Sequence, residues 1–147
     1  MKTILEAATR GEVIRRIGAL SGANVAEWGK MNVRQMVVHC AISEESYLGK
    51  KTYKRAFLGR VFGPSALKNI IKDDRPLGRD ARTLPDFLVD GDGDLESGKK
   101  NWIALVHEYD HLPSRGIVHW FFGEMTREQV GIFAYKHNDH HLRQFGC

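Results

Sequence analysis

The sequence predicts an all-α protein: an antiparallel bundle of four helices, with a long irregular connection between the second helix and the third. Two observations lead to this prediction. Apolar residues recur at helical spacing in four stretches, and a run of glycines and prolines separates the second stretch from the third. The 147 residues, of which 42% are hydrophobic, are enough for one domain with a single core.

The first two helices follow from periodicity and from their end signals. The first covers about 2–20 and ends at the turn over 21–22. Asn32 is the expected cap of the second, which covers about 33–54. The inward positions of the two helices are predicted to be Ile4, Leu5, Val13, Ile14 and Ile17, then Met36, Val37, Cys40, Ala41, Tyr47 and Leu48.

The connection to the third helix spans residues 57–93, where eight glycines and prolines punctuate the chain. Its part over 59–63 has no phosphate-loop spacing and is interpreted as a turn, and only a short helix around 65–72 is expected. Alternating carboxylates over 90–94 resemble the start of a calcium loop, but Leu95 stands where such a loop needs glycine. We expect instead an acidic turn that places negative charge at the start of the third helix.

The third and fourth helices have clear ends. The third runs from the acidic turn to Leu112, and Pro113 stops it. A turn carrying Gly116 leads to the last helix, where Thr126 is the expected cap and Gln129 completes a capping box. The apolar positions of the third helix are Trp102, Leu105, Val106 and Tyr109.

Composition argues against several classes of protein. No apolar run approaches the roughly 20 residues needed to cross a bilayer, and charges interrupt residues 1–16, where a secretory signal would be apolar. Cys40 and Cys147 do not suggest a disulfide framework. We therefore expect a cytoplasmic protein with free thiols and no membrane partner.

The net charge of +4 raises the question of a nucleic-acid partner. Basic residues are spread along the chain, and the one local cluster has no interleaved stacking aromatics of the kind that single-strand binders use. A solvated basic face is the simpler interpretation, so no nucleic-acid partner is expected. The cluster consists of Lys50, Lys51, Lys54, Arg55 and Arg60.

The most informative stretch is the last helix, in which His137 and His141 lie four residues apart. At about 100° per residue they fall in the middle of the apolar stripe that contains Val130, Phe133 and Ala134. Two imidazoles on a core-facing stripe cost free energy unless their ring nitrogens are satisfied. A metal ion shared by both rings would satisfy them, because residues four apart on a helix point the same way.

A third ligand has to come from another helix, and His39 is the best candidate. It lies at the edge of the second helix's apolar stripe, beside Met36 and Ser43. This position suits a ligand that lines a cavity at one end of the bundle. It also suits a partly exposed histidine with no role.

The segment 107–111 is a literal match to the zinc-protease signature H-E-x-x-H. That chemistry needs both histidines and the glutamate on a closed face that lines a cleft. In this helix, His107 and His111 lie opposite the stripe that contains Trp102 and Tyr109. We interpret the motif as a polar outer face and not as a protease site.

Three segments together resemble the DinB/YfiT-like superfamily, and more narrowly one of its branches of unknown function. They are the run from Trp28 through residues 32–40, the segment 119–123 and the closing residues 135–145. The similarity covers most of the chain in matching order. It implies a four-helix bundle that holds a divalent metal ion through one histidine of the second helix and an H-x-x-x-H pair of the fourth. Carried over to this sequence, the ligands are His39, His137 and His141.

Three neutral imidazoles with open positions for water or substrate are typical of a catalytic metal site, and zinc or nickel suits them best. Such an ion can lower the pKa of bound water or of a thiol.

Characterised members of the superfamily include transferases and isomerases that use low-molecular-weight thiols, and others have been suggested to be hydrolases. We expect a metal-dependent enzyme acting on a small molecule, with a thiol-dependent S-transferase or a hydrolase as the candidates. The alternative is a binding or stress-associated protein whose metal is structural. Only the resemblance suggests a homodimer.

Five further residues are candidates for the surroundings of the metal: Ser43, Tyr47, Trp102, His119 and His140. His119 either lines the pocket or hydrogen-bonds its own turn. His140 is expected beside the ligands or at the surface. Core packing is the favoured interpretation of Ser43, Tyr47 and Trp102, and no catalytic acid or base is predicted.

Overall fold

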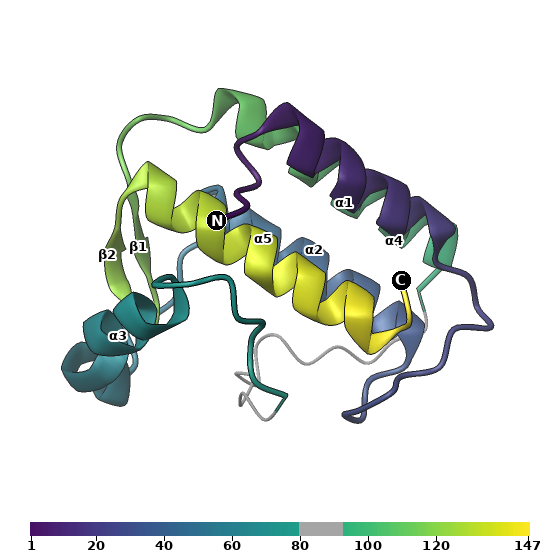
Figure 1. The fold of residues 1–147 in the computed structure, drawn as a ribbon, viewed down its shortest axis with the longest axis horizontal. Helices are drawn as coiled ribbons and strands as arrows, with labels where there is room; N and C mark the ends of the chain where they lie inside the picture. Colours follow the sequence, from purple (N-terminus) through teal and green to yellow (C-terminus); the bar gives the residue numbers. More distant parts are fainter. Residues whose placement is uncertain (80–92) are drawn as a thin grey trace.

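The computed structural model describes residues 1–79 and 93–147 and confirms a mostly helical protein (Figure 1). It differs from the prediction by a small antiparallel sheet and by a longer helix where only a short one around 65–72 was expected. In order, the described elements are α1 (Ala7–Ala19), α2 (Val33–Tyr47), α3 (Phe57–Ile70), α4 (Leu95–His107), the 3₁₀ helix η2 (Glu108–His111), β1 (Ile117–His119), β2 (Gly123–Met125) and α5 (Arg127–Gln144).

Four helices enclose the core, and they do not all run antiparallel to their neighbours. α1 packs on α4 and α5, and α2 packs on the same two helices. In Figure 1, α1 and α5 run in one direction, and α2 and α4 run in the other. The pairs α1–α4 and α2–α5 are therefore antiparallel, as expected, whereas α1–α5 and α2–α4 are parallel. The difference arises because α4 begins at the end of the molecule where α2 began (Figure 1).

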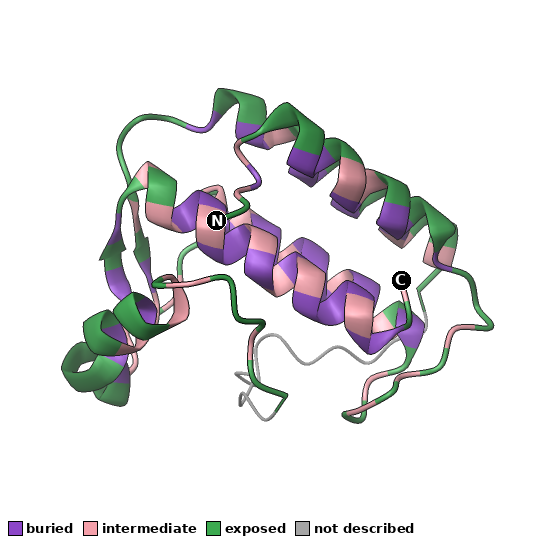
Figure 2. Cartoon of the chain, in the orientation of Figure 1, coloured by how far each residue is buried: buried purple, intermediate pink, exposed green. Residues whose placement is uncertain are grey.

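The core is most complete around α2 and α5 (Figure 2). No residue from 130 to 145 is exposed, and none from 35 to 48. Trp102, Tyr109 and Phe145 are the largest side chains that are fully buried. A helix that is covered on all sides can place polar groups in the interior on more than one face.

The predicted cap at Asn32 and the predicted capping box at Thr126 are confirmed, and Asn32 also forms a capping box with Gln35. The Gln35 amide nitrogen donates to Asn32 Oδ1 at 2.9 Å, and the Asn32 amide nitrogen donates to Gln35 Oε1 at the same distance. Thr126 and Gln129 form the equivalent pair at the start of α5. α2 ends at Tyr47 and does not continue to about residue 54, because Gly49 adopts a left-handed φ of 73° that turns the chain away.

The expected acidic turn over 90–94 lies largely outside the described residues. Of this turn, Asp94 caps α4, since its carboxylate accepts a hydrogen bond from the Ser97 amide nitrogen at 2.8 Å. The predicted third helix then ends in the 3₁₀ turn η2, directly before Leu112.

α3 corrects the prediction of an irregular connection with only a short helix around 65–72. Gly59 and Gly63, interpreted from the sequence as parts of a turn, lie within a regular helix. A Cβ atom at either position would overlap the main chain of Phe121. The glycines therefore allow close packing of two backbones, and the helix tolerates the missing hydrogen bond of Pro64.

The β1–β2 hairpin was not predicted, since strands of three residues are too short to show alternation. Ile117 pairs with Met125, and His119 pairs with Gly123. A turn was expected at Gly116, and in the structure a Cβ atom at this position would overlap the main chain of Met125. Glycine therefore allows the two main-chain segments to approach each other closely where the hairpin begins.

Neither α1–α5 nor η2, the helices in the part of the chain that the structure describes, is both long and apolar enough to cross a membrane. Cys40 and Cys147 are free thiols, as predicted.

Candidate metal centre

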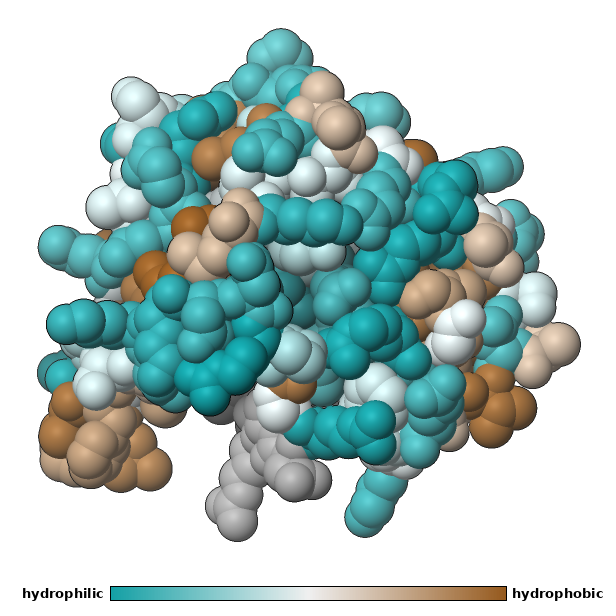
Figure 3. Space-filling model, in the orientation of Figure 1, coloured by the Kyte–Doolittle hydropathy of each residue, from teal (hydrophilic) through white to brown (hydrophobic). Residues whose placement is uncertain are grey.

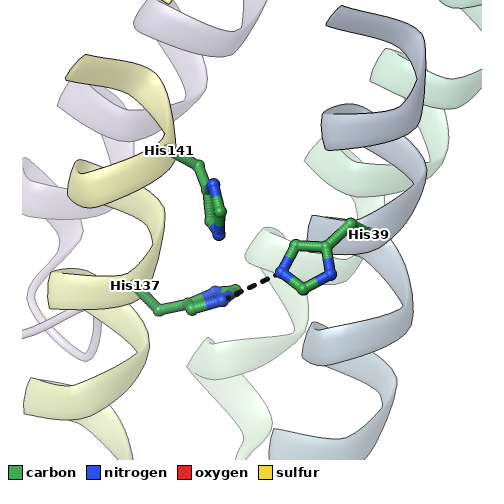
Figure 4. Close-up of side chains that lie close together, drawn as sticks. All are labelled: His39, His137 and His141. Carbon is green, nitrogen blue, oxygen red and sulfur yellow. Dashed lines mark hydrogen bonds between the residues drawn. The ribbon is translucent and has the colours of Figure 1, made fainter. Parts of the chain in front are cut away.

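Three histidine rings meet between α2 and α5 (Figure 4). His39 comes from α2, and His137 and His141 come from successive turns of α5. One ring nitrogen of each residue lies within 4.8 Å of the other two. The Nε2 atoms of His39 and His137 are 3.3 Å apart, and the ring centroid of His141 lies 4.8 Å from that of His39. We call these three residues the histidine cluster.

The antiparallel packing of α2 on α5 brings the cluster together. His137 and His141 share one face of α5 because they are four residues apart. His39, predicted at the edge of its stripe, is only 4% exposed because α5 covers that edge. His141 is also buried, and His137 is half-buried.

Gln144 fixes the orientation of the His141 ring. Its Nε2 donates to the Trp28 carbonyl oxygen at 2.6 Å, which turns its Oε1 toward His141 Nδ1 at 2.8 Å. An amide oxygen only accepts hydrogen bonds, so His141 carries its proton on Nδ1 and its lone pair on Nε2. A hydrogen-bond acceptor behind the ring is the usual support of a metal-binding histidine. Sequence reasoning missed Gln144, although its place three residues after His141 is a signal.

Burial keeps His137 and His141 neutral. It lowers the pKa of His141 to about 3, with the nearby His39 ring as the next cause. Burial also lowers the pKa of His137 well below its ordinary value, and the His141 and His39 rings add to this effect. Within the described part of the chain, His137 Nδ1 is buried without a hydrogen-bond partner. Three converging imidazoles, two of them held neutral by burial, form a donor set that fits a divalent cation.

Aromatic rings enclose the cluster on one side. The Tyr47 ring packs edge-on against His137, with centroids 5.6 Å apart, and Phe133 packs against both residues. Tyr47 therefore lies beside the rings and is buried in the core, which agrees with the favoured interpretation of core packing. Ser43 is buried, and its hydroxyl donates to the main-chain carbonyl of His39 at 2.9 Å, so it supports the helix that carries a ring.

His119 hydrogen-bonds its own turn, which was one of its two predicted roles. Its Nδ1 accepts from the amide nitrogens of Phe121 at 3.1 Å and Phe122 at 3.2 Å. Burial lowers the pKa of His119 to about 4, with Arg55 as a smaller cause. The ring stacks on Tyr47, which also contacts His137.

His140 is buried beside the cluster and is not a surface residue. Its ring centroid lies 4.9 Å from that of His141 and 5.6 Å from the Trp28 ring. Burial lowers its pKa, and Arg143 lowers it further. His140 does not belong to the group whose ring nitrogens converge, which agrees with the prediction of a neighbouring position.

Trp102 belongs to a second buried polar group, which we call the Glu44 cluster: Glu44, Trp102, Tyr109 and Asn138. Trp102 Nε1 donates to Asn138 Oδ1 at 3.2 Å, and the Tyr109 hydroxyl donates to Glu44 Oε2. Burial raises the pKa of Glu44 to about 7, against the lowering effect of the Tyr109 hydrogen bond. The sequence analysis did not single out Glu44, although a carboxylate between the buried Cys40 and Tyr47 was a signal.

The H-E-x-x-H segment is on the outside, as predicted. His107 and His111 are exposed, and Glu108 forms an ion pair with Lys50. This segment therefore does not line a closed cleft.

Fold and site together define a mostly helical protein with three convergent histidines in its interior. The chain belongs to a family described as protein of unknown function (DUF1569), whose model matches residues 2–146. No curated protein and no solved structure matches the chain.

Proposed function

We propose that this chain is a divalent-metal-dependent enzyme of the DinB/YfiT-like type. In this proposal α1, α2, α4 and α5 are the four helices of the bundle, and His39, His137 and His141 hold zinc or nickel. The convergence of three ring nitrogens from two helices, with His137 and His141 kept neutral by burial, is the observation that carries it. The segments that resemble the superfamily contain all three histidines.

The number of donors favours catalysis over a purely structural role. Across residues 1–79 and 93–147, the converging group contains three histidines and no further cysteine, aspartate or glutamate. Structural zinc sites usually have four protein ligands, whereas catalytic sites keep a position for water or substrate.

A divalent ion held here would supply Lewis-acid chemistry, which lowers the pKa of a water molecule or thiol that reaches it. The protein's part is to keep His137 and His141 neutral and to fix His141 through Gln144. Tyr47 and Phe133 limit the access of water from one side. We infer transfer of a low-molecular-weight thiol to a small electrophile: a carbon–sulfur bond forms, the bond to the leaving group breaks, and the thiol proton passes to solvent. With water in place of the thiol, the same site would act as a hydrolase.

A structural metal in a non-enzymatic or stress-associated protein is the second candidate. The burial of His39 and His141 favours it, because an ion there would tie α2 to α5. A cytoplasmic location and a homodimer also belong to the proposal; composition suggests the first and the resemblance the second.

Metal analysis combined with chelation separates the two candidates. We expect one zinc or nickel ion per chain and a protein that keeps its helical circular dichroism after chelation. Low-molecular-weight thiols are then screened against small electrophiles, with and without metal, and His141→Ala serves as the inactive variant. Unfolding on chelation, combined with no turnover of any thiol or ester substrate, would favour the structural role. Absence of stoichiometric metal after reconstitution would overturn both.

A further inference from the structure

α3 exposes an apolar face that the fold leaves uncovered. Phe57, Leu58, Val61 and Phe62 are 59–79% exposed. The opposite face, with Gly59, Gly63 and Leu67, is buried, and the two glycines meet the main chain of Phe121. Figure 3 shows the apolar residues as a brown projection at the end of the molecule where Figure 1 places α3. Single exposed apolar residues are common in proteins, but four on one short helix are not.

The same segment concentrates the positive charge of the chain. Residues 46–72 contain seven lysines and arginines and no aspartate or glutamate. Because the whole chain has a net charge of +4, the remaining residues together carry a charge of −3. Lys54, Arg60 and Lys68 are exposed on or beside α3, and Lys50 and Lys51 are exposed just before it.

We propose that α3 docks the protein onto an anionic lipid surface. A helix with exposed aromatic and aliphatic side chains and flanking basic residues is typical of segments that lie in the plane of a membrane interface. The four apolar side chains would enter the boundary between headgroups and acyl chains, and the basic residues would contact lipid phosphates. This proposal departs from the expectation of no membrane partner, which rested on the lack of a spanning segment.

Charge argues against a second copy of this chain as the occupant. In a symmetric dimer the same surface meets itself, so the exposed Lys54, Arg60 and Lys68 of one copy would face the same basic residues of the other. The shape argues against a bound peptide, because α3 forms a projection and not a groove (Figure 3). An extended anionic surface matches both the charge and the shape.

The hairpin holds α3 in a fixed orientation and provides a native probe. The Ala56 amide nitrogen donates to the Trp120 carbonyl oxygen at 3.0 Å, directly before the helix begins. Trp120 lies in the β1–β2 turn, whereas Trp28 and Trp102 belong to other parts of the fold. Docking through α3 would therefore bring Trp120 closest to the lipid.

Vesicle co-sedimentation of the full chain tests the proposal. We expect binding to phosphatidylcholine vesicles that contain phosphatidylglycerol, little binding to phosphatidylcholine alone, and a loss of roughly tenfold or more between low and high salt. The double variant Phe57→Ser with Phe62→Ser, and the triple variant Lys54→Glu, Arg60→Glu and Lys68→Glu, should each bind at least about tenfold more weakly.

Matched variants elsewhere control for general effects. Val25→Ser removes an equally exposed apolar residue, and the triple variant Arg15→Glu, Lys30→Glu and Lys100→Glu makes the same charge change on other exposed positions. Both should bind like the wild type. Brominated lipid should quench tryptophan fluorescence in the wild type and in Trp28→Phe, but far less in Trp120→Phe.

Several outcomes would overturn the proposal. They are equal loss of binding in the matched variants, quenching that does not depend on Trp120, and binding of an oligonucleotide or of a second copy through α3 in place of vesicles. Circular dichroism and metal stoichiometry should be unchanged in all variants. The result is therefore independent of the proposed metal-dependent function.

Discussion

Two buried polar clusters both include residues of α2 and α5, and they differ in the groups they combine. The Glu44 cluster, which also draws on α4 and η2, contains complementary groups: the Tyr109 hydroxyl donates to the carboxyl of Glu44, and the Trp102 indole donates to the amide oxygen of Asn138. The histidine cluster combines three groups of one kind. Its rings are all weak bases, and the neighbouring rings lower the tendency of His137 and His141 to take up a proton.

This difference separates a structural cluster from a binding site. The Tyr109 hydroxyl and the Trp102 indole each find a partner within the Glu44 cluster, although Glu44 Oε1 and Asn138 Nδ2 have none among the described residues. Removal of Glu44 leaves Tyr109 unpaired at a cost in stability. Three converging ring nitrogens cannot all satisfy one another, and the proposed cation would complete them. Removing a member of the histidine cluster should therefore cost affinity for the metal and little stability.

The largest expected effect is on the Glu44 cluster. Glu44→Ala leaves the Tyr109 hydroxyl without its partner and opens a cavity in the core, so the free energy of unfolding should fall by about 4 kcal/mol. Urea unfolding measures this value. Glu124→Ala, at an exposed position of β2, is the control and should change stability by less than about 0.5 kcal/mol. Similar values for both variants would contradict the structural role.

The next effect is on the histidine cluster. His137→Leu removes one of the three converging nitrogens and should lower zinc affinity by at least roughly 100-fold, about 2.7 kcal/mol. In the metal-free protein, the same variant should change the free energy of unfolding by less than about 1 kcal/mol, because an apolar side chain replaces a buried nitrogen without a partner among the described residues. Calorimetric titration and urea unfolding give the two values. His107→Leu, at an exposed position, should leave both unchanged.

The dependence of stability on pH should also distinguish the clusters. Glu44 has a folded-state pKa of about 7, above its ordinary 4.5, so its contribution is complete below pH 4.5 and is lost as the pH rises through 7. From pH 5 to pH 8 the wild type should lose about 2 kcal/mol relative to Glu44→Gln. His119 and His141 act in the opposite direction: their folded-state pKa values are lowered, so protonation of the unfolded chain destabilises the protein as the pH falls below 6.5. Subtracting the stability of Glu44→Gln from that of the wild type at each pH removes the contribution of the histidines, because both proteins contain them. Parallel pH profiles would mean that Glu44 does not titrate near pH 7.

The smallest expected effect is on the support behind the metal site. Gln144→Leu removes the oxygen that accepts from His141 Nδ1, so zinc affinity should fall by about tenfold. Gln144→Glu keeps an acceptor at the same place and should retain the affinity, although its contact with the Trp28 carbonyl is lost. If both variants bind zinc equally weakly, Gln144 acts through packing alone.

The sequence was sufficient for the long helices but not for the middle of the chain. Capping boxes at Asn32 and Thr126 are local signals, and the structure has both. α3 was missed because Gly59 and Gly63 break helices in isolation, whereas here they serve a contact with Phe121 that is distant in sequence. The antiparallel pairs α1–α4 and α2–α5 were predicted, but the parallel pairs α1–α5 and α2–α4 were not. The direction of a helix depends on where the preceding connection ends, and the length of that connection does not determine this.

For the site, one-dimensional spacing predicted the pair on α5 and made His39 the best candidate for the third ligand, which the resemblance then supported. The structure brings the three rings together, and metal binding there stays a prediction. Periodicity placed His39 at the edge of the apolar stripe of α2, because a periodic pattern describes one helix at a time. The side chain is buried because α5 covers that edge. Gln144 and Glu44 were missed for a related reason: polar residues on a buried stripe need partners that only the packed helices supply.

The absence of any exposed residue from Val130 to Phe145 has a consequence for how freely this part of the sequence can change. A surface helix has one face where nearly any residue is accepted, so its tolerance to substitution rises and falls every three to four positions. From Val130 to Phe145 this periodic variation in tolerance should be absent, because the sides of α5 pack against different neighbours. In a library of random variants, these 16 consecutive positions should form an uninterrupted block of intolerance, whereas the outer positions of α3 should accept polar residues without loss of folding.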